Sequence, residues 1–200
     1  MKLYTFPLAP NPTKVEVFLK EKGIELERAL VNLPQGEQKQ PDFLARNPLG
    51  SVPVLELDDG TCIAQSGSIV EYLEELHPDP PMIGRTPRER LEVRSLERMI
   101  DTMILGPTAR LVHSTNSPLP GRKPNPAVAA AARAELARPL EVLDEVVSDR
   151  PFVAGDRVSI ADGTLFAVIR FGGFFGIDVD ARHRNIHRWH ATFRERPSAQ

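Results

Sequence analysis

The stretch of residues 47–76 restricts the possible fold most strongly, because it places a proline at the head of an apolar run. Proline has no amide hydrogen, so within a sheet it is confined to edges, strand starts and special turns. Pro53 nevertheless opens the run 54–57, whose composition is typical of a strand. A cis bond between Val52 and Pro53 removes this conflict, since cis geometry is essentially reserved for X-Pro bonds.

The residues after this strand predict a hairpin followed by a helix. Residues 58–60, Asp-Asp-Gly, form a turn into a second strand over 61–64. Gln65 and Ser66 then precede a helix. Its apolar residues recur at helical spacing: Ile69, Leu73 and Leu76. A serine and the free amides at a helix N-terminus form a seat for a carboxylate, and the bent strand start leaves the backbone of Val52 open to a second peptide-like group. These parts predict a site for a small, carboxylate-bearing peptide.

This order of parts resembles the glutathione-binding half of the glutathione S-transferase family, with its NPxGxVPxL segment, hairpin and Glu/Gln-Ser before a helix. Four further segments resemble that family in the same order. They are residues 1–24, 36–48, 152–166 and 185–200. The resemblance therefore covers nearly the whole chain, and it points to a bacterial form of the serine or nu-like type.

The predicted fold is a thioredoxin-like α/β domain over residues 1–77, a linker over 78–86 and an all-α domain over 87–200. In the first domain, strand patterns alternate with helical ones, which is typical of βαβ units. The linker region is rich in proline, which breaks helices and stiffens connections. The second domain shows three helical patterns. The first starts at the N-cap Thr86 and Pro87, with its apolar residues over 91–104; the others lie at 127–147 and after the capping-box variant 159–162.

Composition limits the class of protein. The chain has 200 residues, of which 41% are hydrophobic, and this suffices for a packed core. Its formal net charge is −2 with both signs interspersed, which argues against nucleic-acid binding. No apolar run is long enough for a membrane span, and no signal segment opens the chain. Cys62 is the only cysteine, which fits a reducing compartment and a small buried side chain. We therefore expect a soluble cytoplasmic protein.

The chemistry that the resemblance implies is the stabilisation of a thiolate, because a free thiol has a pKa of about 8.5. In serine-type members the hydroxyl donor lies five residues before a basic residue, here Lys14, and that position is Ala9. Thr5 occupies the position of the tyrosine used by other members, while Tyr4 is expected to point into the core because strand side chains alternate. The loop has no cysteine either.

Asn11, two residues after Ala9, is the predicted catalytic donor, as an asparagine is in nu-like members. Thr13 is the second candidate and Thr5 the third. Loop amides and the positive end of the first helix would assist the donor. The alternative is that Asn11 serves only as a turn residue, a position that asparagine favours.

The resemblance also implies the glutathione-binding residues. Ser66, with Gln65 beside it, is expected to hold the γ-glutamyl carboxylate, and Val52 to pair with the cysteinyl backbone. Gln38 and Lys39 stand where the family holds the glycine carboxylate, although Lys39 is equally consistent with a solvated charge. The predicted set is completed by Ala9 and Pro53, and by Asp101 reaching the γ-glutamyl amine across a dimer interface.

Two further clusters carry simpler interpretations. His183, His187 and His190 fall on one helical face, but interleaved arginines oppose a divalent ion, so we expect a solvated basic face and no metal site. The phenylalanines near the end of an apolar helix predict core packing, with the electrophile pocket as the alternative. They are Phe171, Phe174 and Phe175.

The resemblance thus implies a homodimeric glutathione transferase that takes glutathione as co-substrate and a small electrophile or disulfide as its partner. It would use the glutathione thiolate for conjugation to the electrophile or for thiol-disulfide or peroxide chemistry. One alternative is a glutathione-dependent disulfide reductase without a protein cysteine. The other is a non-catalytic binding or interaction protein of the same fold, an idea supported by the loss of the hydroxyl at Ala9. The electrophile itself is not encoded in any recognisable pattern.

Overall fold

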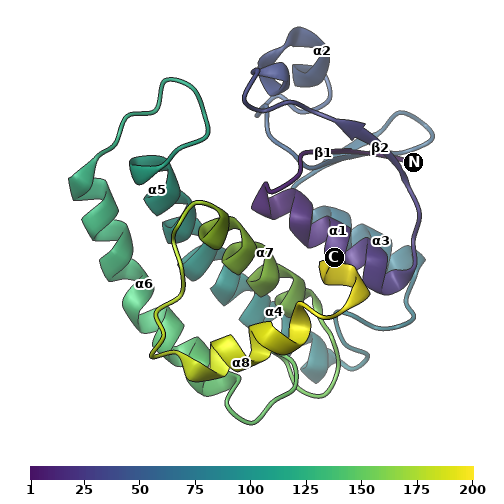
Figure 1. Cartoon of the computed structure of the whole chain (residues 1–200). Helices are drawn as coiled ribbons and strands as arrows, with labels where there is room; N and C mark the ends of the chain where they lie inside the picture. Colours follow the sequence, from purple (N-terminus) through teal and green to yellow (C-terminus); the bar gives the residue numbers. More distant parts are fainter.

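A computed structural model describes all residues 1–200, and its N-terminal part is built on one four-stranded sheet (Figure 1). The strand order is β2-β1-β3-β4. The bounds are β1 Lys2–Thr5, β2 Glu27–Leu30, β3 Val54–Glu56 and β4 Cys62–Ala64. β1 and β2 are parallel, whereas β3 pairs antiparallel with both β1 and β4. The central strands therefore include β3, whose start lies directly after Pro53.

Helices cover both faces of this sheet. On one face lie α1 (Pro10–Lys22) and α3 (Ser66–Leu76), which bury Leu3 and Leu55. On the other face lie the short segments η1 (Glu37–Lys39) and α2 (Pro41–Leu44). Because strand side chains alternate, Tyr4 points to this second face, where its ring packs edge-on against Phe43. Its hydroxyl donates to Glu56 at 2.8 Å, so Tyr4 is turned away from α1.

The connection between the two domains is held by buried charges. Glu74, on α3, accepts the amides of Met82 at 2.9 Å and Ile83 at 3.1 Å. Lys22, at the end of α1, pairs with Glu74 at 2.6 Å and donates to the carbonyl of Pro80 at 2.5 Å. These contacts fix the proline-rich segment against the first domain.

The second domain is entirely helical. Its segments are α4 (Pro87–Met99), η2 (Ile100–Leu105), α5 (Gly106–Thr115), α6 (Pro126–Val146), α7 (Ile160–Phe174), α8 (Arg184–Phe193) and η3 (Pro197–Ala199). The helix predicted to start at Thr86 and Pro87 does begin there, with Thr86 as its N-cap, and it passes through the π-helical η2 directly into α5. None of these helices is long and apolar enough to cross a membrane.

Helix α7 runs through the middle of this domain, and its start is fixed by one buried carboxylate. Asp162 is fully buried; its Oδ1 accepts the amide of Val153 at 2.8 Å and the indole N–H of Trp189 at 2.9 Å. Its Oδ2 accepts both the amide and the hydroxyl of Ser159, at 2.9 and 2.8 Å. The predicted capping-box variant is therefore present, and it also ties α8 to α7.

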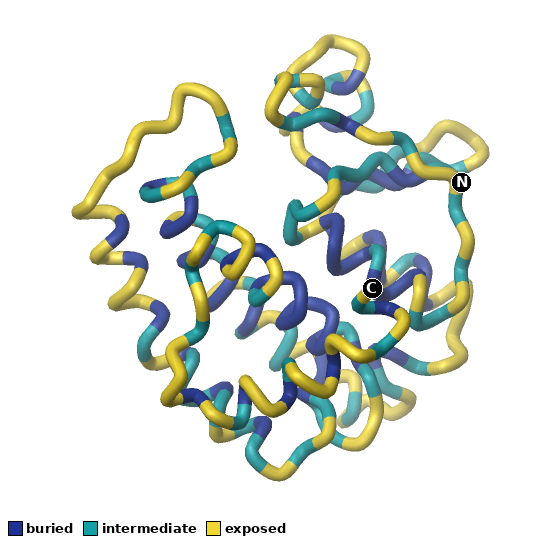
Figure 2. The backbone as a smooth tube through the Cα atoms, in the orientation of Figure 1, coloured by how far each residue is buried: buried dark blue, intermediate teal, exposed yellow.

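The two domains meet where α7 packs along α1 (Figure 1). Figure 2 shows buried residues along both helices. Close approach is possible because Gly163 lacks a side chain: a Cβ there would lie 3.3 Å from Val17 and 3.8 Å from the carbonyl of Lys14. This contact places the N-terminus of α1 beside the second domain.

Candidate functional site

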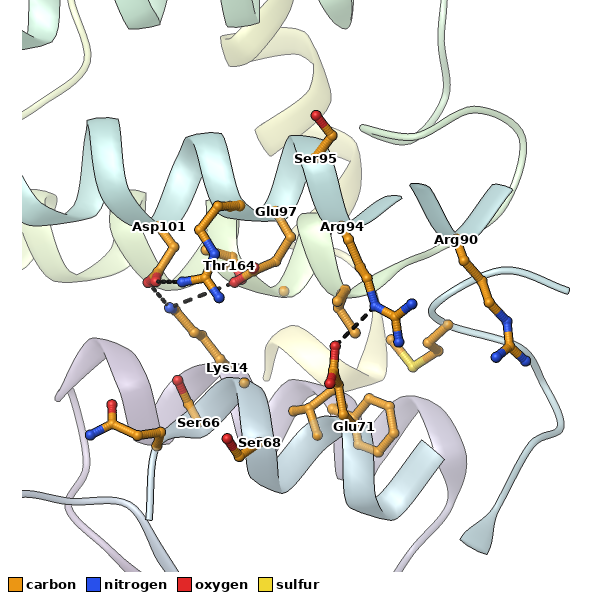
Figure 3. Close-up of a pocket in the computed structure, with 18 of the residues that line it drawn as sticks. Lys14, Ser66, Ser68, Glu71, Arg90, Arg94, Ser95, Glu97, Asp101 and Thr164 are labelled. Atoms are coloured by element: carbon orange, nitrogen blue, oxygen red, sulfur yellow. Dashed lines mark hydrogen bonds and ion pairs between the residues drawn. The ribbon is translucent and has the colours of Figure 1, made fainter. Parts of the chain in front are cut away.

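A cavity of about 1050 Å³ lies between α1 and α3 on one side and α4 on the other (Figure 3). Four of the predicted site residues line it: Asn11, Gln65, Ser66 and Asp101. Arginines of α4 form the opposite wall, and one of them, Arg94, pairs with Glu71 of α3 at 2.9 Å. The cavity therefore joins polar groups from both domains.

The N-terminus of α3 supplies a set of unpaired donors. Gln65 precedes the helix with φ 73° and ψ 120°, a left-handed backbone conformation that is uncommon outside glycine. Ser66 begins the helix and is 8% exposed. The first amides of any helix have no partner within it, so they remain free for an anion. The Ser66 hydroxyl donates to Oδ1 of Asn11 at 3.3 Å, which brings two predicted site residues into contact.

The loop before α1 places the three candidate donors differently. Ala9 is the N-cap of α1 and offers no side-chain cap, while Leu8 before it has φ 68°. Asn11 is exposed in the first turn. Thr13 is buried, and its hydroxyl donates to the carbonyl of Ala9 at 3.0 Å. Thr5 ends β1. Among the candidates, Asn11 alone is an exposed donor on α1.

The start of β3 has the open backbone that the sequence suggested. The peptide bond between Val52 and Pro53 is cis. The Val52 side chain is buried beside Phe43 and Val54. Neither its amide nor its carbonyl has a backbone partner within the chain. Both groups are therefore available to an extended ligand.

Gln38 and Lys39 lie on η1, the short helical segment after β2. Lys39 is exposed, and its ammonium donates to the carbonyl of Leu49 at 3.2 Å. Gln38 donates weakly to the carbonyl of Leu33 at 3.4 Å, while its Oε1 is buried without a partner. Their binding role stays a prediction.

A charged cluster at the base of the cavity contains the predicted Asp101 together with Lys14 and Glu97, and sequence reasoning missed this pairing. Lys14 is 7% exposed and reaches from α1 to the carboxylate of Asp101, with Glu97 at 3.9 Å (Figure 3). Thr164 donates to Glu97 at 3.1 Å, and Arg98 contacts Asp101 at 3.3 Å. Asp101 is thus paired within its own chain, and its predicted contact with a γ-glutamyl amine stays a prediction. In the sequence, Lys14 marked only the start of a helix.

Burial raises the pKa of Glu97, against the opposing effect of Lys14. A folded-state pKa above the unfolded value means that the folded protein binds more protons in that window, so stability falls as the pH rises through it. We expect Glu97→Gln to flatten the fall in unfolding free energy as the pH rises above the ordinary pKa of a glutamate. Denaturant unfolding across this range measures it, with the exposed Glu75→Gln as control; an unchanged slope in Glu97→Gln would contradict the assignment.

The histidine face is only partly as predicted. His183 is buried directly before α8, and His190 is half-buried beside the rings of Phe166 and Trp189. Burial lowers the pKa of His190. Only His187 is exposed, so the prediction of a solvated face was wrong for the other two. No group of His, Cys, Asp and Glu side chains in the chain is arranged to hold a metal ion.

The prediction of core packing holds for one of the phenylalanines of α7 and fails for another. Phe171 is buried beside His113, whose ring centroid lies 6.4 Å away, and this agrees with core packing. Phe174, at the last turn of α7, is 61% exposed, so the core prediction was wrong there. Cys62 is half-buried on β4, and burial raises the pKa of its thiol, which fits an unreactive side chain.

Comparison with known proteins agrees with this geometry. Residues 1–75 match the family described as "Glutathione S-transferase, N-terminal domain", and residues 96–197 match "Glutathione S-transferase, C-terminal domain". A relative named Glutathione S-transferase 2 from Saccharomyces cerevisiae is 33% identical over 208 residues, covering 100% of this chain and 88% of the relative. A Maleylacetoacetate isomerase from Pseudomonas aeruginosa is 29% identical over 210 residues, covering 98% and 94%.

Among solved structures, a glutathione S-transferase domain-containing protein from Marinobacter aquaeolei VT8 superposes with a TM-score of 0.93 at 32% identity, covering 100% of both chains. The chain therefore belongs to the glutathione S-transferase family. The predicted fold class is confirmed, and so is the prediction of a glutathione transferase enzyme.

Proposed function

We propose that this protein binds glutathione between the start of β3 and the N-termini of α1 and α3, and joins the glutathione thiolate to an electrophilic carbon. The observation that carries the proposal is the contact between Ser66 and Asn11 at 3.3 Å. This contact supports the proposal, because it brings together the residue expected to hold the γ-glutamyl carboxylate and the expected amide donor.

Each end of glutathione has a complementary group. The γ-glutamyl carboxylate binds the Ser66 hydroxyl and the free amides of α3, as anions do at helix N-termini. The cysteinyl unit pairs with the open backbone of Val52. Lys39, beside Gln38, attracts the glycine carboxylate. A homodimer, as the resemblance implies, would bring Asp101 of a second copy toward the γ-glutamyl amine.

The sulfur then lies at the N-terminus of α1, beside Ala9. Asn11 donates from Nδ2 to the thiolate. The Ser66 hydroxyl, whose single hydrogen points to Oδ1 of Asn11 in the free protein, turns to the γ-glutamyl carboxylate when glutathione binds. The helix dipole adds to this stabilisation. The thiol proton passes to solvent, the thiolate forms a C–S bond, and the leaving group departs with its electron pair.

A glutathione-dependent disulfide reductase is the second candidate, because Ala9 provides no hydroxyl and the half-buried Cys62 has a raised thiol pKa. In that reaction glutathione thiolate attacks a mixed disulfide and releases the other thiol. A non-catalytic binding protein is the third.

Parallel assays with an aryl halide and with a mixed disulfide of glutathione separate these functions. Aryl transfer above the uncatalysed rate supports the proposal, and disulfide exchange alone favours the reductase. Glutathione binding without turnover of either substrate would leave the non-catalytic function. Calorimetry with glutathione provides the binding measurement for all three.

A further inference from the structure

Arg170, on the exposed side of α7, carries a charge that the proposed glutathione site does not use. Its Nη1 donates to the Thr13 hydroxyl at 3.4 Å, and Thr13 in turn donates to the carbonyl of Ala9 at 3.0 Å. Two successive hydrogen bonds therefore link the guanidinium to Ala9, and the glutathione sulfur is proposed to lie beside Ala9. The bond to Thr13 is the guanidinium's only hydrogen bond, and Arg170 takes part in none of the ion pairs of the molecule.

The direction of α7 explains this placement. Gly163 packs on Val17 and Lys14 of α1, and Arg170 contacts Thr13, nearer the N-terminus of the same helix. The two helices are thus antiparallel, and the C-terminal end of α7 lies beside the first turn of α1 (Figure 1). At a rise of about 1.5 Å per residue, the turn after Arg170 extends roughly 6 Å further along the same direction.

That next turn carries Phe174, four residues after Arg170 and therefore on the same face of α7. Its ring is 61% exposed, although Phe171 and much of the helix before it are buried. Phe174 and Arg170 therefore form one surface, in which a flat apolar ring lies one helical turn from a guanidinium without an ion-pair partner. Asp178, whose carboxylate lies beside Gly173, makes no ion pair with Arg170.

We infer that Arg170 is a specificity-determining residue that selects electrophiles bearing an anionic group on an aromatic ring, such as aryl carboxylates or sulfonates. The ring packs against Phe174 and the anion accepts hydrogen bonds from the guanidinium, whose planar donors match a carboxylate. This inference rests on the proposed function, since it places the electrophile beside the glutathione sulfur. For a chloronitrobenzoate, the thiolate forms a C–S bond at the ring carbon and chloride leaves with the bonding electrons.

Binding of two matched product conjugates tests the inference without requiring turnover. The probes are the glutathione conjugates of a chloronitrobenzoate and of the corresponding chloronitrobenzamide, which differ only in that an uncharged carboxamide of similar size replaces the carboxylate. By calorimetry at low salt, we expect the protein to bind the carboxylate conjugate about tenfold more tightly than the carboxamide. Arg170→Gln should remove this preference and Arg170→Lys should retain part of it.

The matched control is Arg133→Gln, which removes an exposed arginine from α6, a helix that packs on α5 and α8. It should keep the full preference. Equal binding of both conjugates by the unmodified protein, or a preference that survives in Arg170→Gln, would overturn the inference and leave the proposed function standing. If neither glutathione nor either conjugate binds, the proposed function is wrong and the inference fails with it.

Discussion

Substituting Ser66 by alanine is expected to weaken glutathione binding roughly ten- to a hundredfold. The variant loses a hydrogen bond to a charged group, worth about 1.5–3 kcal/mol. The free amides of α3 remain, so binding should be weakened without being abolished.

Ser95 provides the matched control for this experiment. It is an exposed serine on α4, in the wall opposite Ser66 (Figure 3). We expect Ser95→Ala to bind glutathione as the unmodified protein does. Calorimetry compares the dissociation constants of the variants, and an unchanged affinity in Ser66→Ala would show that the γ-glutamyl carboxylate binds elsewhere.

Substituting Asn11 by alanine is expected to lower turnover roughly ten- to a hundredfold, which corresponds to about 1.4–2.7 kcal/mol of lost transition-state stabilisation. Asn11 is exposed in the first turn of α1, so the fold should be retained. Thr13 is not expected to replace the lost donor, because its hydroxyl hydrogen is directed to the carbonyl of Ala9. Single-turnover kinetics with an aryl halide measures the loss.

Adding a hydroxyl beside the proposed sulfur position tests the same thiolate site from the opposite direction. Ala9→Ser restores a hydroxyl at the N-cap of α1, the position where serine-type relatives hold their donor. We expect it to raise aryl-transfer activity. A variant that is no faster than the unmodified protein would mean that the sulfur does not lie beside Ala9.

Much of the fold was predictable because its signals are local in sequence. The segment from Val52 to Ser66 encodes a strand start, a hairpin and a helix N-terminus within a few residues of one another. Pro87 begins α4 as a proline at the first helical position does, and Asp162 caps α7 within one turn of Ser159. Such patterns depend on the backbone conformations and hydrogen bonds of neighbouring residues, so they can be recognised without knowing the tertiary contacts.

The contacts that complete the site were not predictable in this way. Lys14 meets Asp101, which is 87 residues away, and Arg170 meets Thr13, which is 157 residues away. No periodicity encodes which helices of the second domain pack on α1. The errors at His183 and Phe174 have the same origin, because helical spacing shows which residues share a face but not what covers that face.

The pKa of the glutathione thiol in the complex tests the central claim most directly. Thiolate absorbance, followed from acid to alkaline pH with the protein saturated, reports this pKa in the unmodified protein and in two variants. We predict a pKa below the value of about 8.5 for a free thiol, a higher one in Asn11→Ala, and the highest in Asn11→Asp, which replaces the donor by a negative charge. The same thiol pKa in all three proteins would contradict the claim that Asn11 stabilises the thiolate.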